Sequence, residues 1–185
     1  MVYILLGTGF ETTEALTAAD VLRRASLPVT LTGIGGDAVT SSHNVTVRAD
    51  LPVERVTLEE GDMVVLPGGL GGVASIEGSE AAMALIRQAA GDNRLWLAAI
   101  CAAPTLLARA GLLPPGAHCV CYPGMEGALA AAGAVPLMEQ SVVTEGRLVT
   151  GRGPGSAFDF ALALVEVLAG TAAADQVCAA LHYRG

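Results

Sequence analysis

The chain has 185 residues, of which 52% are hydrophobic and 15% charged, and its net charge is −8. This length and composition predict a single domain over residues 1–185 with a sizeable core, and they exclude an intrinsically disordered chain. Arg23-Arg24 is the only pair of adjacent basic residues, so no nucleic-acid partner is expected. The acidic field favours a small neutral substrate over an anionic one.

Neither a membrane span nor a signal peptide is expected. No apolar run approaches the ~18 residues of a span, and the apolar run 2–6 is too short for a signal peptide. We therefore expect a cytoplasmic protein with no membrane partner. The cysteines lack the spacing of a zinc site, so free thiols and no metal or cofactor are expected. They are Cys101, Cys119, Cys121 and Cys178.

Apolar runs alternate with segments of helical spacing along the chain. This alternation predicts an α/β fold with a mainly parallel sheet that is covered by helices on both faces. In chain order, the predicted elements are strand 2–6, a helix capped by Thr12 or Thr13 and running to about Ala25, strand 28–34, a short antiparallel excursion over 36–50, strand 63–66, a glycine-rich turn from Pro67 to Gly69, a helix capped by Ser79 and running to about Ala90, strand 95–100, helix 103–110, strand 117–122, helix 126–132, a hairpin over 141–150, helix 156–168 and helix 172–181.

One junction between a strand and a helix carries a candidate nucleophile. The apolar strand 95–100 stops at Cys101, and the next helix begins almost at once, with Pro104 in its first turn. This is the layout of a nucleophile elbow, where a helix N-terminus favours the thiolate and backbone amides face outward. The alternative is an inert cysteine buried in the core.

Two other strand ends lie where a parallel sheet places its sites. Gly68 and Gly69 form either an ordinary tight turn or a loop whose Gly69 N–H faces the thiolate. Glu11 and Glu14 are spaced so that one helical face holds both. They either complement the helix dipole or bring a carboxyl beside the thiolate, where its pKa would rise and it would shuttle a proton.

The three histidines do not point to a cysteine–histidine catalytic pair. None of them directly follows the candidate nucleophile, and no spacing connects them to it; they are His43, His118 and His182. Cys119 and Cys121 alternate as strand residues do, so packing in the core is their expected role.

Around these residues the sequence resembles the ThiJ/PfpI superfamily, and within it the branch of the Parkinsonism-associated protein deglycase and its bacterial relatives. The resemblance spans nearly the whole chain. Its strongest stretches are GFETTEALTAADVLRRA (9–25), VVLPGGLGG (64–72), LAAICAAPTLLA (97–108) and GRGPGSAFDFALALVE (151–166). It implies a flavodoxin-like three-layer sandwich, similar to class I glutamine amidotransferases, that usually forms a homodimer.

The resemblance also assigns expected roles to single residues. Cys101 matches the family's oxidation-sensitive nucleophile, and Glu14 matches the protonated glutamate that is hydrogen-bonded to it. Gly69 and Ala102 match the backbone donors around the thiolate. Further positions expected at the pocket or the dimer interface are Glu11, Gly68, Arg24, Tyr122 and Arg152.

The sequence departs from the family at three positions. Tyr122 stands where animal members carry the histidine of a His-Pro pair, which argues against a histidine-assisted mechanism. Ser41 stands where animal relatives carry a peripheral cysteine, so no second redox site is expected there. Ala102 stands where the peptidase-like branch has a histidine, which argues against peptidase or amidotransferase chemistry.

The resemblance implies an enzyme that needs no cofactor and converts a 2-oxoaldehyde such as methylglyoxal, or its adducts on a glycated protein, to a 2-hydroxy acid. Cys101 would attack the aldehyde, the amides of Gly69 and Ala102 would stabilise the oxyanion, and Glu14 would move the proton. The alternative is an oxidative-stress sensor or redox-regulated chaperone, in which Cys101 oxidises to a sulfinate held by Glu14.

Overall fold

A seven-stranded sheet forms the centre of the computed structural model, which describes residues 1–183. All strand pairs in this sheet are parallel except the edge hairpin. Across the sheet, the strands are β10 (Val142–Glu145), β11 (Leu148–Gly151), β7 (Trp96–Ile100), β6 (Met63–Leu66), β1 (Val2–Leu6), β2 (Val29–Gly33) and β5 (Leu51–Pro52).

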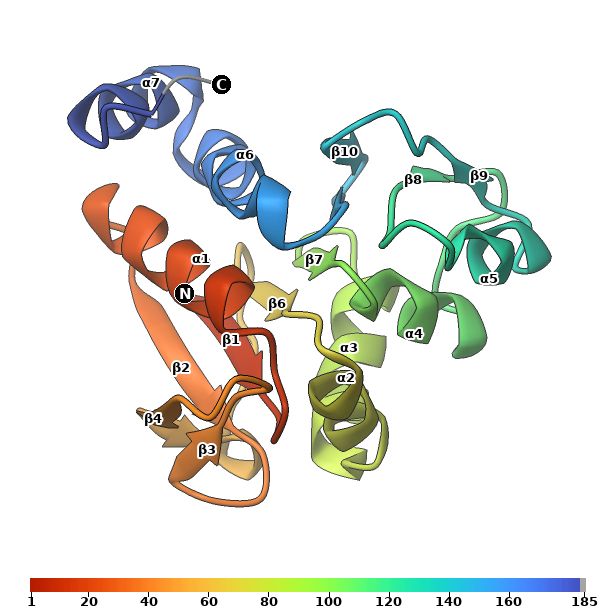
Figure 1. The fold of residues 1–185 in the computed structure, drawn as a ribbon, viewed down its shortest axis with the longest axis horizontal. Helices are drawn as coiled ribbons and strands as arrows, with labels where there is room; N and C mark the ends of the chain where they lie inside the picture. The colour runs from red at the N-terminus through yellow and green to blue at the C-terminus, as the bar shows by residue number, and fades with distance from the viewer. Residues whose placement is uncertain (184–185) are drawn as a thin grey trace.

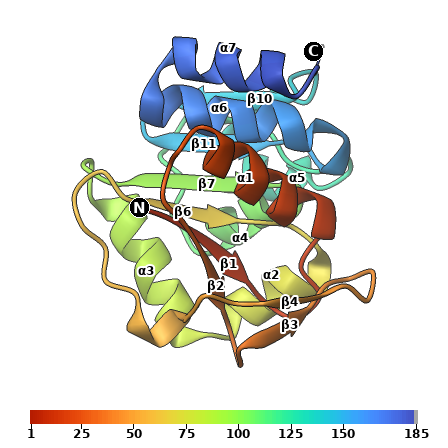
Figure 2. The same cartoon turned by 90° about the vertical axis from the view of Figure 1, so that its left-hand side faces the viewer.

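Helices cover both faces of the sheet, because strands that are apolar on both sides must be buried on both sides (Figures 1 and 2). On one side of the sheet lie α1 (Thr12–Arg24), α6 (Ala157–Ala169) and α7 (Thr171–Ala180). On the other side lie α2 (Leu70–Glu77), α3 (Glu80–Gly91) and α4 (Ala103–Arg109). Within residues 1–183, no helix is both long and apolar enough to cross a membrane.

Smaller elements fill the connections between these layers. These elements are an antiparallel hairpin, a second two-stranded ladder, one short helix and two 3-10 turns. They are β3 (Ala38–Thr40) with β4 (Thr46–Arg48), β8 (His118–Cys119) with β9 (Val135–Pro136), α5 (Glu126–Ala131), and the turns Val53–Arg55 and Pro154–Ser156.

The order of the parallel strands fixes where a site can form. Read by their place in the chain, β2, β1, β6, β7 and β11 follow the 2-1-3-4-5 order of flavodoxin-like sheets. The connections change direction between β1 and β6, so a crevice opens there beyond the carboxyl ends of the strands. The segments that follow β1, β6 and β7 therefore meet at one edge of the sheet.

The predicted α/β architecture is confirmed, and most element boundaries agree within one or two residues. Strands 2–6 and 63–66 match the structure, and the excursion over 36–50 contains the β3–β4 hairpin. Ser79 caps α3 as predicted, since its Oγ accepts a hydrogen bond from the Ala82 N–H at 3.3 Å.

Helix α2 was not predicted, because its first turn contains two glycines where only a turn was expected. Gly72 is required by close packing against the segment after β1, and Gly71 packs against the same segment. A Cβ on Gly72 would lie 2.6 Å from the Phe10 Cα, and one on Gly71 would lie 3.3 Å from the Gly9 Cα. Low helix propensity at these positions is therefore outweighed by tertiary contact.

The predicted strand 117–122 is mostly wrong, since only His118–Cys119 pairs with another strand. Further along the segment, the Tyr122 N–H donates to the Cys101 carbonyl at 2.8 Å instead of to a strand neighbour. Tyr122, at the end of the segment, is thus hydrogen-bonded to the turn after β7, and the backbone there no longer pairs with a neighbouring strand.

The predicted cap of α1 is also wrong. Glu11 occupies the N-cap position, and its side chain makes no capping bond. The Thr12 hydroxyl instead donates to the Ser41 Oγ at 2.7 Å, which ties the start of α1 to the loop of the β3–β4 hairpin. Ser41 is buried in this contact, where animal relatives were expected to carry a cysteine.

Gly72→Ala is expected to lower the free energy of unfolding by about 1–3 kcal/mol. Alanine normally stabilises a helix relative to glycine, but here its Cβ would meet backbone atoms of Phe10 that cannot rotate away. Chemical denaturation measures the change. Gly127→Ala in α5 is the matched control, because an added Cβ there meets nothing within 4 Å. Equal effects of the two substitutions would contradict this packing argument.

Candidate active site

Cys101 sits on a strained turn between β7 and α4. Its φ is +65°, in the left-handed region that a residue with a Cβ rarely adopts. Two backbone hydrogen bonds hold it there: its N–H donates to the Gly151 carbonyl at 2.9 Å, and its carbonyl accepts from the Tyr122 N–H at 2.8 Å. The turn is therefore a nucleophile elbow, as the sequence predicted.

Two backbone amides face the sulfur, those of Gly69 and Ala102. The residue as a whole is 8% exposed. Glycine is required at position 68, because a Cβ there would lie 2.6 Å from the Cys101 Cβ and 3.0 Å from its Sγ. The Gly68–Gly69 turn is thus a donor loop packed directly on the thiol, which was one of its two predicted interpretations.

The carbonyl group of each of these two donor peptides accepts a hydrogen bond from another backbone N–H. The Gly69 N–H shares its peptide with the Gly68 carbonyl, which accepts from the Glu11 N–H at 2.9 Å. The Ala102 N–H shares its peptide with the Cys101 carbonyl, which accepts from Tyr122. A hydrogen bond to the carbonyl of a peptide polarises its N–H, so both donors are strengthened as well as positioned.

Glu14 brings a buried carboxyl to the thiol from the first turn of α1. It is 1% exposed, and its Oε2 accepts a hydrogen bond from the Gly68 N–H at 2.7 Å. Its Oε1 is the one buried side-chain nitrogen or oxygen among residues 1–183 that lacks a hydrogen-bond partner. A buried polar atom without a partner calls for an explanation. An Oε1 that carries a proton for the sulfur or for a substrate oxygen provides one.

The pKa of Glu14 is raised from 4.5 to about 7, chiefly because burial disfavours the charged carboxylate. The negative charge of Glu11 adds to the rise, whereas hydrogen bonds from the Gly68 N–H and from Cys101 oppose it. The predicted rise is confirmed.

The pKa of the Cys101 thiol is raised to about 12, so the predicted effect of the helix N-terminus does not decide the net shift. Burial is the largest cause, and the charge and hydrogen bonding of Glu14 add to it. The Gly69 and Ala102 amides lower the pKa without outweighing these effects. Burial thus raises the pKa of both the thiol and the carboxyl.

Glu11 does not share a helical face with Glu14, because it precedes the helix. Its Oε2 accepts from the Ser42 hydroxyl at 3.1 Å and lies 3.6 Å from the His43 Nδ1. His43 is therefore linked to the site through Glu11, a connection that no sequence spacing indicated. The β3–β4 hairpin makes this link, since its loop folds back over the start of α1.

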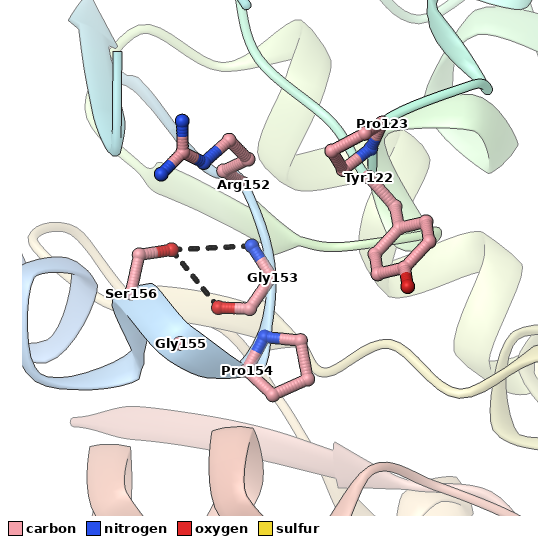
Figure 3. A pocket seen from close by; sticks show the side chains of 7 residues that line it. All are labelled: Tyr122, Pro123, Arg152, Gly153, Pro154, Gly155 and Ser156. Carbon is pink, nitrogen blue, oxygen red and sulfur yellow. Dashed lines mark hydrogen bonds between the residues drawn. The ribbon is translucent and has the colours of Figure 1, made fainter. Parts of the chain in front are cut away.

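Tyr122 and Arg152 both line a hollow of about 210 Å³ next to the elbow (Figure 3). Arg24 is not brought to the site within this chain. It lies at the far end of α1, roughly 15 Å along the helix axis from Glu14, and it pairs with Asp20 at 2.8 Å.

The other thiols and histidines do not join this site. Cys119 and Cys121 are fully buried, which raises the pKa of each thiol, and His118 faces Glu145 at 3.4 Å. Over residues 1–183, no group of three or more His, Cys, Asp or Glu side chains is arranged to hold a metal ion.

A flavodoxin-like fold in which a cysteine on a strand-to-helix turn lies beside a buried carboxyl defines a class of α/β proteins. The model of the DJ-1/PfpI family matches residues 1–167, and the chain belongs to this family. It is 40% identical to protein dj-1beta of Drosophila melanogaster over 96% of this chain and 94% of that protein. The crystal structure of Drosophila melanogaster DJ-1beta matches with a TM-score of 0.92 and 37% identity, covering 100% of this chain and 98% of that one.

Two further relatives carry names that describe chemistry. A Caenorhabditis elegans protein named glutathione-independent glyoxalase DJR-1.2 is 28% identical over 86% of this chain and 83% of its own length. A structure of Toxoplasma gondii DJ-1 described as oxidized matches with a TM-score of 0.90 and 31% identity, covering 100% of this chain and 98% of that one. The family thus includes a protein named as a glyoxalase.

Glu14→Gln is expected to remove a pH dependence of stability. Because the native pKa is raised to about 7, the folded state binds this proton more tightly than the unfolded chain. Its contribution to the free energy of unfolding is complete below pH 4.5 and is lost as the pH rises to about 7. The loss is roughly 3 kcal/mol. Urea denaturation of wild type and E14Q across this interval measures it. If the free energies of unfolding of the two proteins differ by the same amount at every pH, the raised pKa of Glu14 is contradicted.

Proposed function

We propose that this protein is a cysteine-dependent glyoxalase that needs no cofactor. It converts methylglyoxal-type 2-oxoaldehydes, or their adducts on glycated proteins, to 2-hydroxy acids. The observation that carries the proposal is the unpaired, buried Oε1 of Glu14 beside a nucleophile elbow with two positioned amides. A group that must both give and take a proton needs a pKa near the working pH, and that of Glu14 is about 7.

The first step forms a carbon–sulfur bond. The Cys101 sulfur attacks the aldehyde carbon, and its proton passes to the Glu14 carboxylate, so that no net charge is added to a buried site. The aldehyde oxygen becomes an oxyanion, which the Gly69 and Ala102 amides stabilise. The product of this step is a hemithioacetal.

The second step moves a proton between the two carbons. The Glu14 acid first protonates the oxyanion, and the resulting carboxylate removes the hydrogen from the former aldehyde carbon to give an enediolate. Glu14 then returns this proton to the neighbouring carbon, and the hydroxyl proton on the first carbon passes to the oxygen on the second. The first carbon is oxidised to a thioester and the second is reduced to an alcohol, so no external electron acceptor is needed. Water hydrolyses the thioester to the 2-hydroxy acid and restores the thiol.

Deglycation is the same chemistry on an adduct that has already formed. A methylglyoxal hemithioacetal or hemiaminal on a protein presents the same two carbons, and its sulfur or nitrogen is the leaving group. The acidic charge of the chain, −8, suits a neutral aldehyde or adduct. The name of the C. elegans relative supports the glyoxalase activity.

Formation of lactate from methylglyoxal without glutathione tests the proposal. Reduced wild type is expected to turn over many times, Cys101→Ser to form no lactate above background, and Glu14→Gln to lose about 10²–10⁴-fold in kcat. The product itself must be measured, because any thiol removes methylglyoxal reversibly. Cys178→Ser is the matched control, since this thiol lies in α7 and donates to the Tyr183 carbonyl at 3.1 Å. Lactate that never exceeds one equivalent per chain would contradict the proposal.

A second candidate function uses the same residues. The two amides and the protonated Glu14 are also suited to hold the oxygens of a Cys101 sulfinate, and one relative is described as oxidized. Two molecules of peroxide oxidise the thiolate in turn to a sulfenate and a sulfinate, and each step releases water. In this candidate the oxidised form controls a stress-protective or chaperone role.

Graded oxidation by hydrogen peroxide is expected to separate the two candidates. Peptide mapping by mass spectrometry gives the fraction of Cys101 that carries two oxygen atoms. If the protein is an enzyme, lactate formation falls in proportion to that fraction, because the sulfinate is no nucleophile. If it is a redox-regulated chaperone, suppression of aggregation of a client protein rises with the same fraction. The Cys101→Ser variant controls for oxidation elsewhere.

The proposed partners are a small reactive aldehyde or a glycated protein, together with a second copy of this chain, in the cytoplasm. Leu70, which directly follows the donor loop, is 72% exposed and is suited to an interface between copies. Sedimentation velocity at micromolar concentration tests the homodimer.

A further inference from the structure

A buried hydroxyl holds the peptide that follows the Ala102 amide. Thr105 is 2% exposed, and its Oγ1 donates to the Ala102 carbonyl at 2.8 Å, to which the Thr105 N–H also donates at 3.1 Å. The preceding peptide carries the Ala102 N–H, and its carbonyl, that of Cys101, accepts from the Tyr122 N–H at 2.8 Å. Both peptides that flank the Ala102 Cα are therefore held through their carbonyls, and neither rotates without loss of a hydrogen bond.

The Thr105 hydroxyl is in turn held by a charged side chain one turn further along α4. The Arg109 Nη1 donates to the Thr105 Oγ1 at 2.9 Å. A hydroxyl that accepts a hydrogen bond from a cation becomes a stronger donor itself. The guanidinium therefore strengthens the bond from Thr105 to the Ala102 carbonyl, and it fixes the direction in which the hydroxyl proton points.

Arg109 also joins α4 to α2. Its Nε and Nη2 donate to the two carboxylate oxygens of Glu77, at 3.3 and 2.9 Å, and these residues are the last of their two helices. The helices lie side by side on one face of the sheet (Figure 1). Helix α2 starts directly after Gly69, which carries the other amide that faces the sulfur. Two hydrogen bonds between a guanidinium and a carboxylate fix orientation as well as distance. The helices that follow the two donor amides are thus tied together at their far ends.

We propose that Thr105 and Arg109 are positioning residues that keep the Ala102 amide directed at the Cys101 sulfur. The side chains of Arg109 and Glu77 are each 46% exposed, so the ion pair contributes to geometry more than to stability. The inference rests on the proposed function only for the oxyanion that the amide stabilises during the reaction. The effect of the amide on the thiolate is independent of that function.

The rate at which iodoacetamide alkylates Cys101 at about pH 8 tests the proposal. Only the thiolate reacts, and the Ala102 amide favours the thiolate. A misdirected amide therefore slows alkylation, whereas a merely structural defect exposes the buried sulfur and speeds it. Thr105→Val and Arg109→Lys are each expected to lower the rate about three- to tenfold, less than the ~10²-fold cost of losing a whole oxyanion donor. Peptide mapping follows the rate at this residue alone.

Matched variants separate positioning from a general loss of contacts. Thr105→Ser keeps the hydroxyl and is expected to react at the wild-type rate. Arg87→Lys is the control for the surface charge, because Arg87 pairs with Glu80 at 2.9 Å within the single helix α3. Thr105→Val combined with Arg109→Lys is expected to be no slower than either change alone, since both break the same chain of hydrogen bonds. Arg109 is exposed, so Arg109→Lys decides the question if Thr105→Val does not fold.

Lactate formation from methylglyoxal distinguishes this inference from the proposed function. If both hold, Thr105→Val and Arg109→Lys lower kcat and leave KM unchanged, because the amide acts on the transition state. If alkylation slows but no form of the protein makes lactate, the proposed function fails and the positioning role stands. Unchanged or faster alkylation in these two variants, or an equal loss in Arg87→Lys, overturns the inference whatever the activity.

Discussion

The left-handed backbone of Cys101 is the constraint on which the site depends. A residue with a Cβ in this region costs roughly 1–2 kcal/mol, and two backbone hydrogen bonds offset that cost by tying the residue to β11 on one side and to Tyr122 on the other. In an ordinary extended conformation the backbone of the residue after β7 would continue the strand. At a φ of +65°, the chain instead turns at once into α4, and the sulfur faces the amides of Gly69 and Ala102.

Burial then decides the acid–base behaviour of the site. Burial disfavours a charge on both Glu14 and Cys101, because each is largely removed from water. Glu14 disfavours the thiolate further, whereas the hydrogen bond from Cys101 favours the carboxylate. In the proposed reaction, bond formation at the sulfur and proton transfer to the carboxyl are linked events. The unpaired Oε1 belongs to the same arrangement, since a fully paired carboxyl would have no position from which to exchange a proton with a substrate.

The contacts that hold the two donor peptides are made by backbone atoms. The Glu11 and Tyr122 amides hold the two donor peptides whatever side chains these residues carry. Tyrosine therefore replaces the expected histidine at position 122 without loss of that contact. The side chains of Glu11 and Tyr122 are not constrained by these backbone contacts. Glycine is required at position 68, in contrast, by contact with Cys101 and Glu14.

The sequence by itself determined the layered α/β fold, and it singled out the cysteine of the elbow and the carboxyl that lies beside it. Apolar runs predict buried strands, and a cysteine between such a run and a helix predicts an elbow. Both patterns can be recognised because they involve residues that are neighbours along the chain. It did not determine α2, since the glycines at its start, which have low helix propensity, pack against the backbone of Gly9 and Phe10. It also misjudged the pKa of Cys101, because the helix start is visible in the sequence whereas burial and the charge of Glu14 arise only on folding. The contact of the Tyr122 ring with Gly153 likewise joins segments that only the tertiary structure brings together.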